Sequence, residues 1–197
     1  LSSSLAVDLA KKYDADLHVF HLTTEKEMEL FTSGEVDNKK ITAEVCVHHM
    51  HFNNSYYAEL GNQIKCNPSI KMESDRLALI DALKGNKIDI IATDHAPHTW
   101  DEKNQDYPSA PAGLPLVQHG LQILMDFYHE GILSLEMIVE KTSHNVAKRF
   151  QIKDRGYIRE GYYADLTVLD LGKPYEVSKE NILYKVGWSP FTGKTFN

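Results

Sequence analysis

The chain has few cysteines and no long hydrophobic run, and each of these absences excludes a class of protein. Its only two cysteines, Cys46 and Cys66, lie twenty positions apart and form no CxxC pair. This spacing argues against a disulfide framework and against a zinc site made of thiolates, and reduced thiols favour a cytoplasmic protein. No hydrophobic run approaches the length of a membrane span, and no charged and then apolar leader opens the sequence.

The chain also lacks a block of basic residues, because its 21 Lys and Arg are scattered along the sequence. Its 28 Asp and Glu outnumber them, and the formal net charge is −7. This balance argues against a nucleic-acid-binding protein. We therefore expect a small-molecule partner or another protein surface, with no nucleic acid and no membrane. Because the sequence starts without Met and stops without a capping signal, we also expect a fragment of a longer protein.

What the sequence does contain is a regular alternation of helical and strand patterns up to residue 150. The predicted strands are 17–22, 41–47 and 88–92, and the predicted helices are 5–13, 24–30, 74–85, 115–131 and 134–150. Helices between successive strands indicate right-handed βαβ units and a parallel sheet. Glycines and the alternation at residues 166–169 then predict short antiparallel strands in a smaller all-β part, residues 151–197.

The most informative stretch follows the strand 88–92, where residues 94–98 read Asp-His-Ala-Pro-His. Pro97 prevents the strand from continuing, so Asp94, His95 and His98 are expected at its carboxyl end. That end of the strands is where α/β barrels keep their catalytic residues.

All three predicted strands end in residues that can bind a metal. These residues are His21 on the first strand, His48 and His49 on the second, and Asp94, His95 and His98 on the third. Imidazole and carboxylate groups bind catalytic zinc at about 2.0–2.2 Å, and neighbouring parallel strand ends bring them together. A metal-bound Asp can also take a proton from the metal-bound water, so the pattern predicts a metal-assisted hydrolase.

Other candidates have ordinary structural explanations. Asn67-Pro68 reads as a turn, and residues 108–114 read as a loop in which Gly113 would let a backbone N–H approach a ligand closely. Three more histidines lie on helical patterns away from the strand ends and are expected at the surface: His119, His129 and His144.

Five motifs occur in an order that resembles the amidohydrolase superfamily. They are LHVFHLTT (17–24), AEVCVHH (43–49), NPSIK (67–71), ATDHAPH (92–98), and GYIREG (156–161) followed by ADL (164–166). Within the superfamily the chain is most similar to the dihydroorotases of the long bacterial type, over nearly its whole length. The Asp-His-Ala-Pro-His element is the most specific part, since hydantoinases and allantoinases usually carry other residues after the Asp-His pair.

The resemblance implies an α/β fold, a TIM (β/α)8 barrel with a binuclear zinc site beside a small β-sandwich domain. Residues 1–150 would be the C-terminal portion of the barrel, about its last three strands and their helices. Residues 151–197 would be part of the β-sandwich. A full barrel needs about 250 residues, and the family's His-x-His pair and bridging Lys are expected before residue 1. We therefore expect the chain to be inactive alone.

The resemblance also implies roles for individual residues. His21 and Asp94 would be metal ligands, and Asp94 would be the general acid/base that carries a proton to the leaving nitrogen. The substrate-binding residues would be His98 at the ring carboxylate, Asn67 at the pyrimidine ring, and Ala112 and Gly113 through their backbone amides. His48 and His49 match a family pair that does not bind the metal directly.

The implied reaction is the reversible hydrolysis of the cyclic amide of (S)-dihydroorotate to N-carbamoyl-L-aspartate, a step of de novo pyrimidine biosynthesis. One alternative is another cyclic amidase, such as a dihydropyrimidinase, hydantoinase or allantoinase, whose substrates lack the ring carboxylate. A second alternative is a non-catalytic scaffold subunit with the same fold. A homodimer is compatible with each of these hypotheses.

Overall fold

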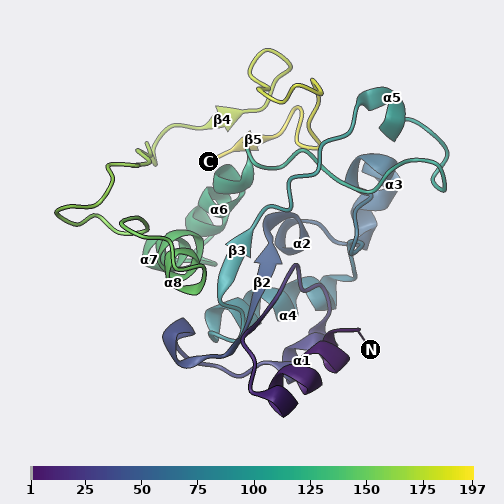
Figure 1. The fold of residues 1–197 in the computed structure, drawn as a ribbon. Coiled ribbons are helices and arrows are strands. Elements are labelled where there is room, and N and C mark those ends of the chain that lie inside the picture. The colour runs from purple at the N-terminus through teal and green to yellow at the C-terminus, as the bar shows by residue number, and fades with distance from the viewer. Residues whose placement is uncertain (1) are drawn as a thin grey trace.

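A parallel three-stranded sheet forms the centre of the computed structural model, which describes residues 2–197 (Figure 1). Its strands are β1 (Leu17–Val19), β2 (Ile41–Cys46) and β3 (Ile90–Ala92), in the order β1-β2-β3. Leu17 pairs with Ile41, and Val45 pairs with Ile91. Each strand therefore lies beside the next one in the chain, which confirms the predicted parallel arrangement.

Helices connect and flank these strands. The longer ones are α1 (Ser2–Tyr13), α4 (Glu73–Lys84) and α6 (Gly120–His129). A second helical region joins α7 (Leu135–Val139), the π-helical turn η5 (Glu140–His144) and α8 (Asn145–Arg149). The short helices are η1 (Glu25–Leu30), η2 (Val36–Asn38), α2 (Val47–His51), η3 (Asn54–Tyr56), α3 (Tyr57–Leu60), η4 (Gly61–Ile64) and α5 (Trp100–Lys103).

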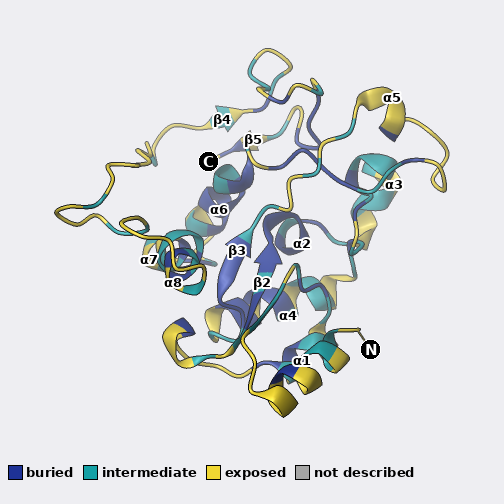
Figure 2. Ribbon diagram, viewed as in Figure 1, coloured by how far each residue is buried: buried dark blue, intermediate teal, exposed yellow. Residues whose placement is uncertain are grey.

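The hydrophobic core lies between the sheet and these helices, and β2 and β3 are mostly buried (Figure 2). Val45 in β2, Leu83 in α4 and Ile123 in α6 have no exposed surface. The predicted first helix is present, but Leu5 and Leu9 on its expected apolar face are exposed. Val7 faces the core instead, because the helix packs through the other side.

The helix predicted over 115–131 begins five residues later, at Gly120. Residues 115–119 have a different partner, because the backbone N–H groups of Leu116 and Val117 donate to His95 Nδ1 at 3.0 and 3.2 Å. A short helix that the sequence did not predict, α5, follows the residues after β3. Thr99 and Glu102 form a capping box there and stabilise α5.

The strand expected at residues 166–169 is absent, and this prediction was wrong. Leu166 and Val168 are 60% and 93% exposed, so their alternation has no sheet to pack against (Figure 2). The structure instead pairs β4 (Tyr175–Glu176) with β5 (Thr195–Phe196), antiparallel. Phe196 joins the hydrophobic core, and the chain's C-terminus lies next to α6 in Figure 1.

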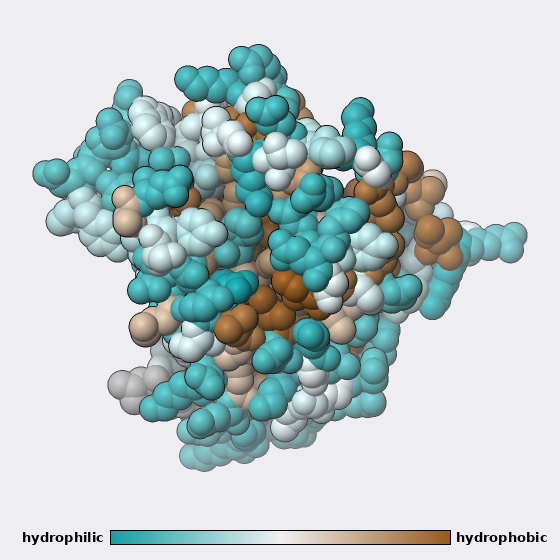
Figure 3. All heavy atoms as spheres, turned by 180° about the vertical axis from the view of Figure 1, so that it is seen from behind, coloured by the Kyte–Doolittle hydropathy of each residue, from teal (hydrophilic) through white to brown (hydrophobic). Residues whose placement is uncertain are grey.

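Hydrophobic atoms also reach the surface, where they gather near the middle of the face seen from behind (Figure 3). Exposed apolar patches of this kind are typical of surfaces that another chain or domain covers. None of the helices in the described part of the chain combines the length and hydrophobicity that crossing a membrane requires.

Candidate metal and substrate site

The predicted metal ligands lie at the carboxyl ends of the outer two strands. His21 follows β1 and Asp94 follows β3, and both have a positive φ, of 40° and 47°. Such a backbone conformation costs a non-glycine residue about 1–3 kcal/mol, and residues strained in this way cluster at functional sites. The backbone beyond His21 is tied to β2, since Leu22 N–H donates to Glu44 O at 2.9 Å.

The buried end of β2 lies between the strands that carry these two residues. His21 and Asp94 each contribute to the pKa of a side chain there. Burial lowers the pKa of His49 to about 4, and His21 is among the charged neighbours that lower it further. Burial also raises the pKa of the Cys46 thiol, with added contributions from the Glu44 and Asp94 carboxylates. His21 and Asp94 therefore lie at the same edge of the sheet, the carboxyl ends of its strands, and their role as metal ligands stays a prediction.

The loop after β3 brings three of the predicted substrate-binding residues together. His98 Nε2 donates to Ala112 O at 3.2 Å, and its Nδ1 lies 3.9 Å from a Glu102 carboxylate oxygen. Gly113 is buried beside them, and its N–H donates to Lys65 O at 2.9 Å. Asn67 is exposed on a separate turn, next to Pro68, whose carbonyl accepts a hydrogen bond from His49 Nε2 at 2.9 Å.

His95 plays a structural part within this loop. Its Nδ1 accepts the two backbone hydrogen bonds from residues 116 and 117, and burial lowers its pKa. A neutral ring at neutral pH can keep accepting both bonds, so His95 positions the segment between β3 and α6.

Lys103 is a residue of this region that the sequence did not single out. Its ammonium group is buried and donates to three backbone carbonyls, those of Lys65, Pro111 and Gly113, at 2.9–3.1 Å. Burial lowers its pKa to about 8. Lys103 thereby holds the segment that carries Ala112 and Gly113. The Thr99–Glu102 capping box was the available signal, because it predicts that a helix begins just before Lys103.

The prediction of a surface role for His119 was wrong. The side chain has no exposed surface, and its Nδ1 lies within hydrogen-bonding distance of the Tyr184 and Ser189 hydroxyls, at 3.2 and 3.1 Å. Both hydroxyls come from residues far along the chain, so the helical pattern around His119 could not reveal them.

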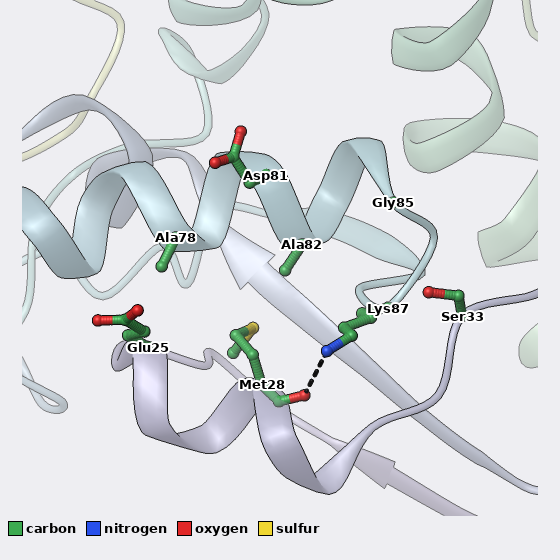
Figure 4. A pocket seen from close by; sticks show the side chains of 8 residues that line it. All are labelled: Glu25, Met28, Ser33, Ala78, Asp81, Ala82, Gly85 and Lys87. Carbon is green, nitrogen blue, oxygen red and sulfur yellow. Dashed lines mark hydrogen bonds between the residues drawn. The ribbon is translucent and has the colours of Figure 1, made fainter.

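A further surface hollow lies between η1 and α4 and contains none of the predicted site residues (Figure 4). Glu25 and Asp81 border it, and Lys87 Nζ donates to Met28 O at 3.3 Å across it. Its walls carry neither histidine nor a convergent pair of metal ligands, so the strand ends are the better candidate site.

Comparisons with known proteins identify the family. Residues 6–193 match the model of the amidohydrolase family. The dihydroorotase of Endomicrobium trichonymphae is 35% identical over 189 residues, which is 95% of this chain and 45% of the relative. The dihydroorotase of Methanosphaera stadtmanae is 35% identical over 97% of this chain and 44% of its own. The chain thus spans a little under half the length of these relatives.

Solved structures show the same fold. The L-hydantoinase (dihydropyrimidinase) of Arthrobacter aurescens superimposes with a TM-score of 0.89 at 24% identity, over 98% of this chain and 44% of that one. A dihydroorotase from Saccharomyces cerevisiae, in complex with 5-fluoroorotic acid, gives 0.69 at 19% identity over 77% of this chain and 43% of its own. With its TIM-barrel-type α/β fold and the match over residues 6–193, the chain belongs to the amidohydrolase family.

Proposed function

We propose that the protein containing these residues is a dihydroorotase, which reversibly hydrolyses the cyclic amide of dihydroorotate to N-carbamoyl-L-aspartate. The observation that carries this proposal is the loop after β3, where Asp94 is followed four positions later by His98, in contact with Ala112. A metal-binding carboxylate and a cationic or hydrogen-bonding imidazole on one loop suit a substrate that has both an amide ring and a carboxylate. The dihydroorotases matched at 35% identity support it.

His21 and Asp94 are the residues that would hold zinc, since one supplies a nitrogen and the other an oxygen donor at neighbouring strand ends. Zinc bound there would supply an activated hydroxide at neutral pH. Catalytic zinc sites use three protein ligands, so a binuclear site requires further ligands from outside this chain. A cytoplasmic location and a homodimer are parts of the same proposal.

The chain's own residues would bind the substrate and move the proton. Asp94 accepts a proton through a carboxylate oxygen and returns it to the ring nitrogen that leaves when the amide bond breaks. His98 pairs with the ring carboxylate, and Asn67 hydrogen-bonds the ring. Gly113 N–H is already bonded to Lys65, so Ala112 supplies the backbone amide of this loop.

A related cyclic amidase is the second candidate, because the L-hydantoinase structure superimposes closely on this chain. Hydantoins and dihydropyrimidines lack the carboxylate that His98 would bind. A substrate panel therefore separates the two functions: faster turnover of the carboxylate-free compounds would favour the hydantoinase. A scaffold protein without catalysis would turn over neither class of substrate when full length.

The test of the proposal is Asp94→Asn in the full-length protein. We expect kcat for dihydroorotate to fall at least about a hundredfold, since a positioned general acid/base contributes about 10²–10⁴-fold. Asp8→Asn on the exposed side of α1 is the matched control, with the same change of charge far from the strand ends. Unchanged turnover in the Asp94 variant would rule the assignment out.

A further inference from the structure

Cys46, His48 and His49 form a cluster at the carboxyl end of β2. One candidate ligand atom from each residue lies within 4.8 Å of the others, and all three side chains are buried. The cluster is local in sequence, because Cys46 is the last residue of β2 and the two histidines lie in the first turn of α2. The turn from strand to helix brings the three side chains close together.

The hydrogen bond of His49 leaves a ring nitrogen free for a ligand. Its Nε2–H donates to Pro68 O at 2.9 Å, so Nδ1 carries the lone pair. Nδ1 is buried and has no hydrogen-bond partner among residues 2–197. Histidines that bind metals are commonly held in this way, with the other ring N–H on a backbone carbonyl that sets the tautomer and the ring orientation.

His48 has a similar need for a partner. The ring has no exposed surface, lies 4.0 Å from the His49 ring between centroids, and has neither nitrogen hydrogen-bonded within the described chain. Buried polar groups without a partner are rare in folded proteins and call for an explanation such as an ion. Burial also favours the neutral ring, the form that offers a lone pair.

We propose that Cys46, His48 and His49 bind a zinc ion through one sulfur and two nitrogens, in a site that uses neither His21 nor Asp94. Thiolate and imidazole donors together favour zinc over magnesium or calcium, which prefer oxygen. The Cys46 thiol releases its proton to solvent as the zinc–sulfur bond forms. Cys66 stays outside the ligand set, because its thiol donates to the same Pro68 carbonyl at 3.1 Å.

X-ray absorption at the zinc edge tests this site without any substitution. In the full-length protein loaded with zinc, we expect a sulfur neighbour at about 2.3 Å beside nitrogens at about 2.0–2.1 Å. A site made of His21 and Asp94 has no sulfur donor. A spectrum that fits nitrogen and oxygen neighbours alone would therefore overturn the proposal.

Three variants identify the residues. Cys46→Ser is expected to remove the sulfur neighbour and weaken zinc binding at least tenfold, measured by competition with a chelator. Cys66→Ser, the matched control, and Asp94→Asn should both keep the sulfur neighbour and the affinity. If Cys66→Ser removes the sulfur and Cys46→Ser does not, the ligand assignment is wrong. The turnover lost in the full-length Asp94→Asn protein is a separate readout, so each proposal can fail alone.

Discussion

Gly113 sits where two backbone segments of the candidate site pass each other. Its φ is +140°, and a Cβ built on it would overlap the carbonyl oxygen of Ala96 and approach the Ala96 Cβ to 2.8 Å. The same segments are joined by the hydrogen bond from Ala96 N–H to Leu114 O at 3.0 Å. The sequence suggested a close backbone approach at this glycine, and the structure shows that the approaching partner is the chain itself.

Gly113→Ala should therefore destabilise the protein by about 2–6 kcal/mol, the sum of backbone strain and overpacking. Urea unfolding measures this change. Gly131→Ala is the matched control, because Gly131 also has a positive φ, of +70°, but a Cβ there would meet nothing within 4 Å. We expect only the strain, about 1–3 kcal/mol, in the control. Equal losses in both variants would contradict a steric role for Gly113.

At the scale of elements, Asp89 holds the start of β3 against β2. One carboxylate oxygen accepts a hydrogen bond from Lys39 Nζ at 2.7 Å, and the other accepts one from Ala43 N–H at 3.0 Å. The Lys39 and Asp89 side chains are 5% and 1% exposed. The sequence placed Asp89 inside an apolar strand without indicating a partner, because Lys39 lies fifty positions earlier.

Asp89→Asn should cost about 3–5 kcal/mol of stability, because it leaves the Lys39 ammonium buried without a counter-charge. Chemical denaturation measures the loss. The double variant Asp89→Asn with Lys39→Met removes the stranded charge and should recover part of the stability. If the stability loss of the double variant equals the sum of the two single losses, the Lys39 and Asp89 side chains do not stabilise each other.

At the scale of the whole molecule, the C-terminal segment returns to the candidate site. His119 contacts the Tyr184 and Ser189 hydroxyls, and its ring stacks on Phe196 with 6.3 Å between centroids. Trp188 Nε1 donates to His98 O at 2.8 Å, which ties this segment to the loop after β3. The boundary expected at residue 150 remains a proposal, but residues near the C-terminus pack on the main core.

His119 should make the stability depend on pH. Burial lowers its pKa to about 4, against 6.5 in an exposed chain, and burial raises the pKa of its neighbour Tyr184 to about 12, so no charge faces the ring. Between these two histidine values only the unfolded state binds the proton. Stability therefore falls as pH drops from about 6.5 to about 4, by at most about 1.4 kcal/mol per pH unit for this group.

Urea unfolding across this pH range, with His119→Phe as the variant, isolates the contribution of one histidine. We expect the free energy of unfolding of the variant to depend less steeply on pH, by up to about 1.4 kcal/mol per pH unit. The remaining pH dependence, from His49 and His51 among others, should stay. The same slope in both proteins would show that His119 is not protonated on unfolding.

The order of the elements and the positions of the candidate metal ligands could be predicted from the sequence alone. Alternating helical and strand periodicity is a local property, and it indicated the parallel strands and the positions of His21 and Asp94 at their ends. The substrate-binding roles of His98, Ala112 and Gly113 came from a resemblance, and the structure places His98 in contact with Ala112. Their roles in binding and catalysis remain proposals.

Only the tertiary structure decided which polar groups are buried. His119 and Asp89 owe their environments to partners 65 and 50 residues away, and Lys103 owes its own to carbonyls between 8 and 38 residues away. Periodicity carries no information about such partners. The strand prediction for residues 166–169 was wrong for the same reason, since an alternating segment becomes a strand only when another strand lies beside it. Local sequence therefore determined the strand ends, and long-range packing determined what surrounds them.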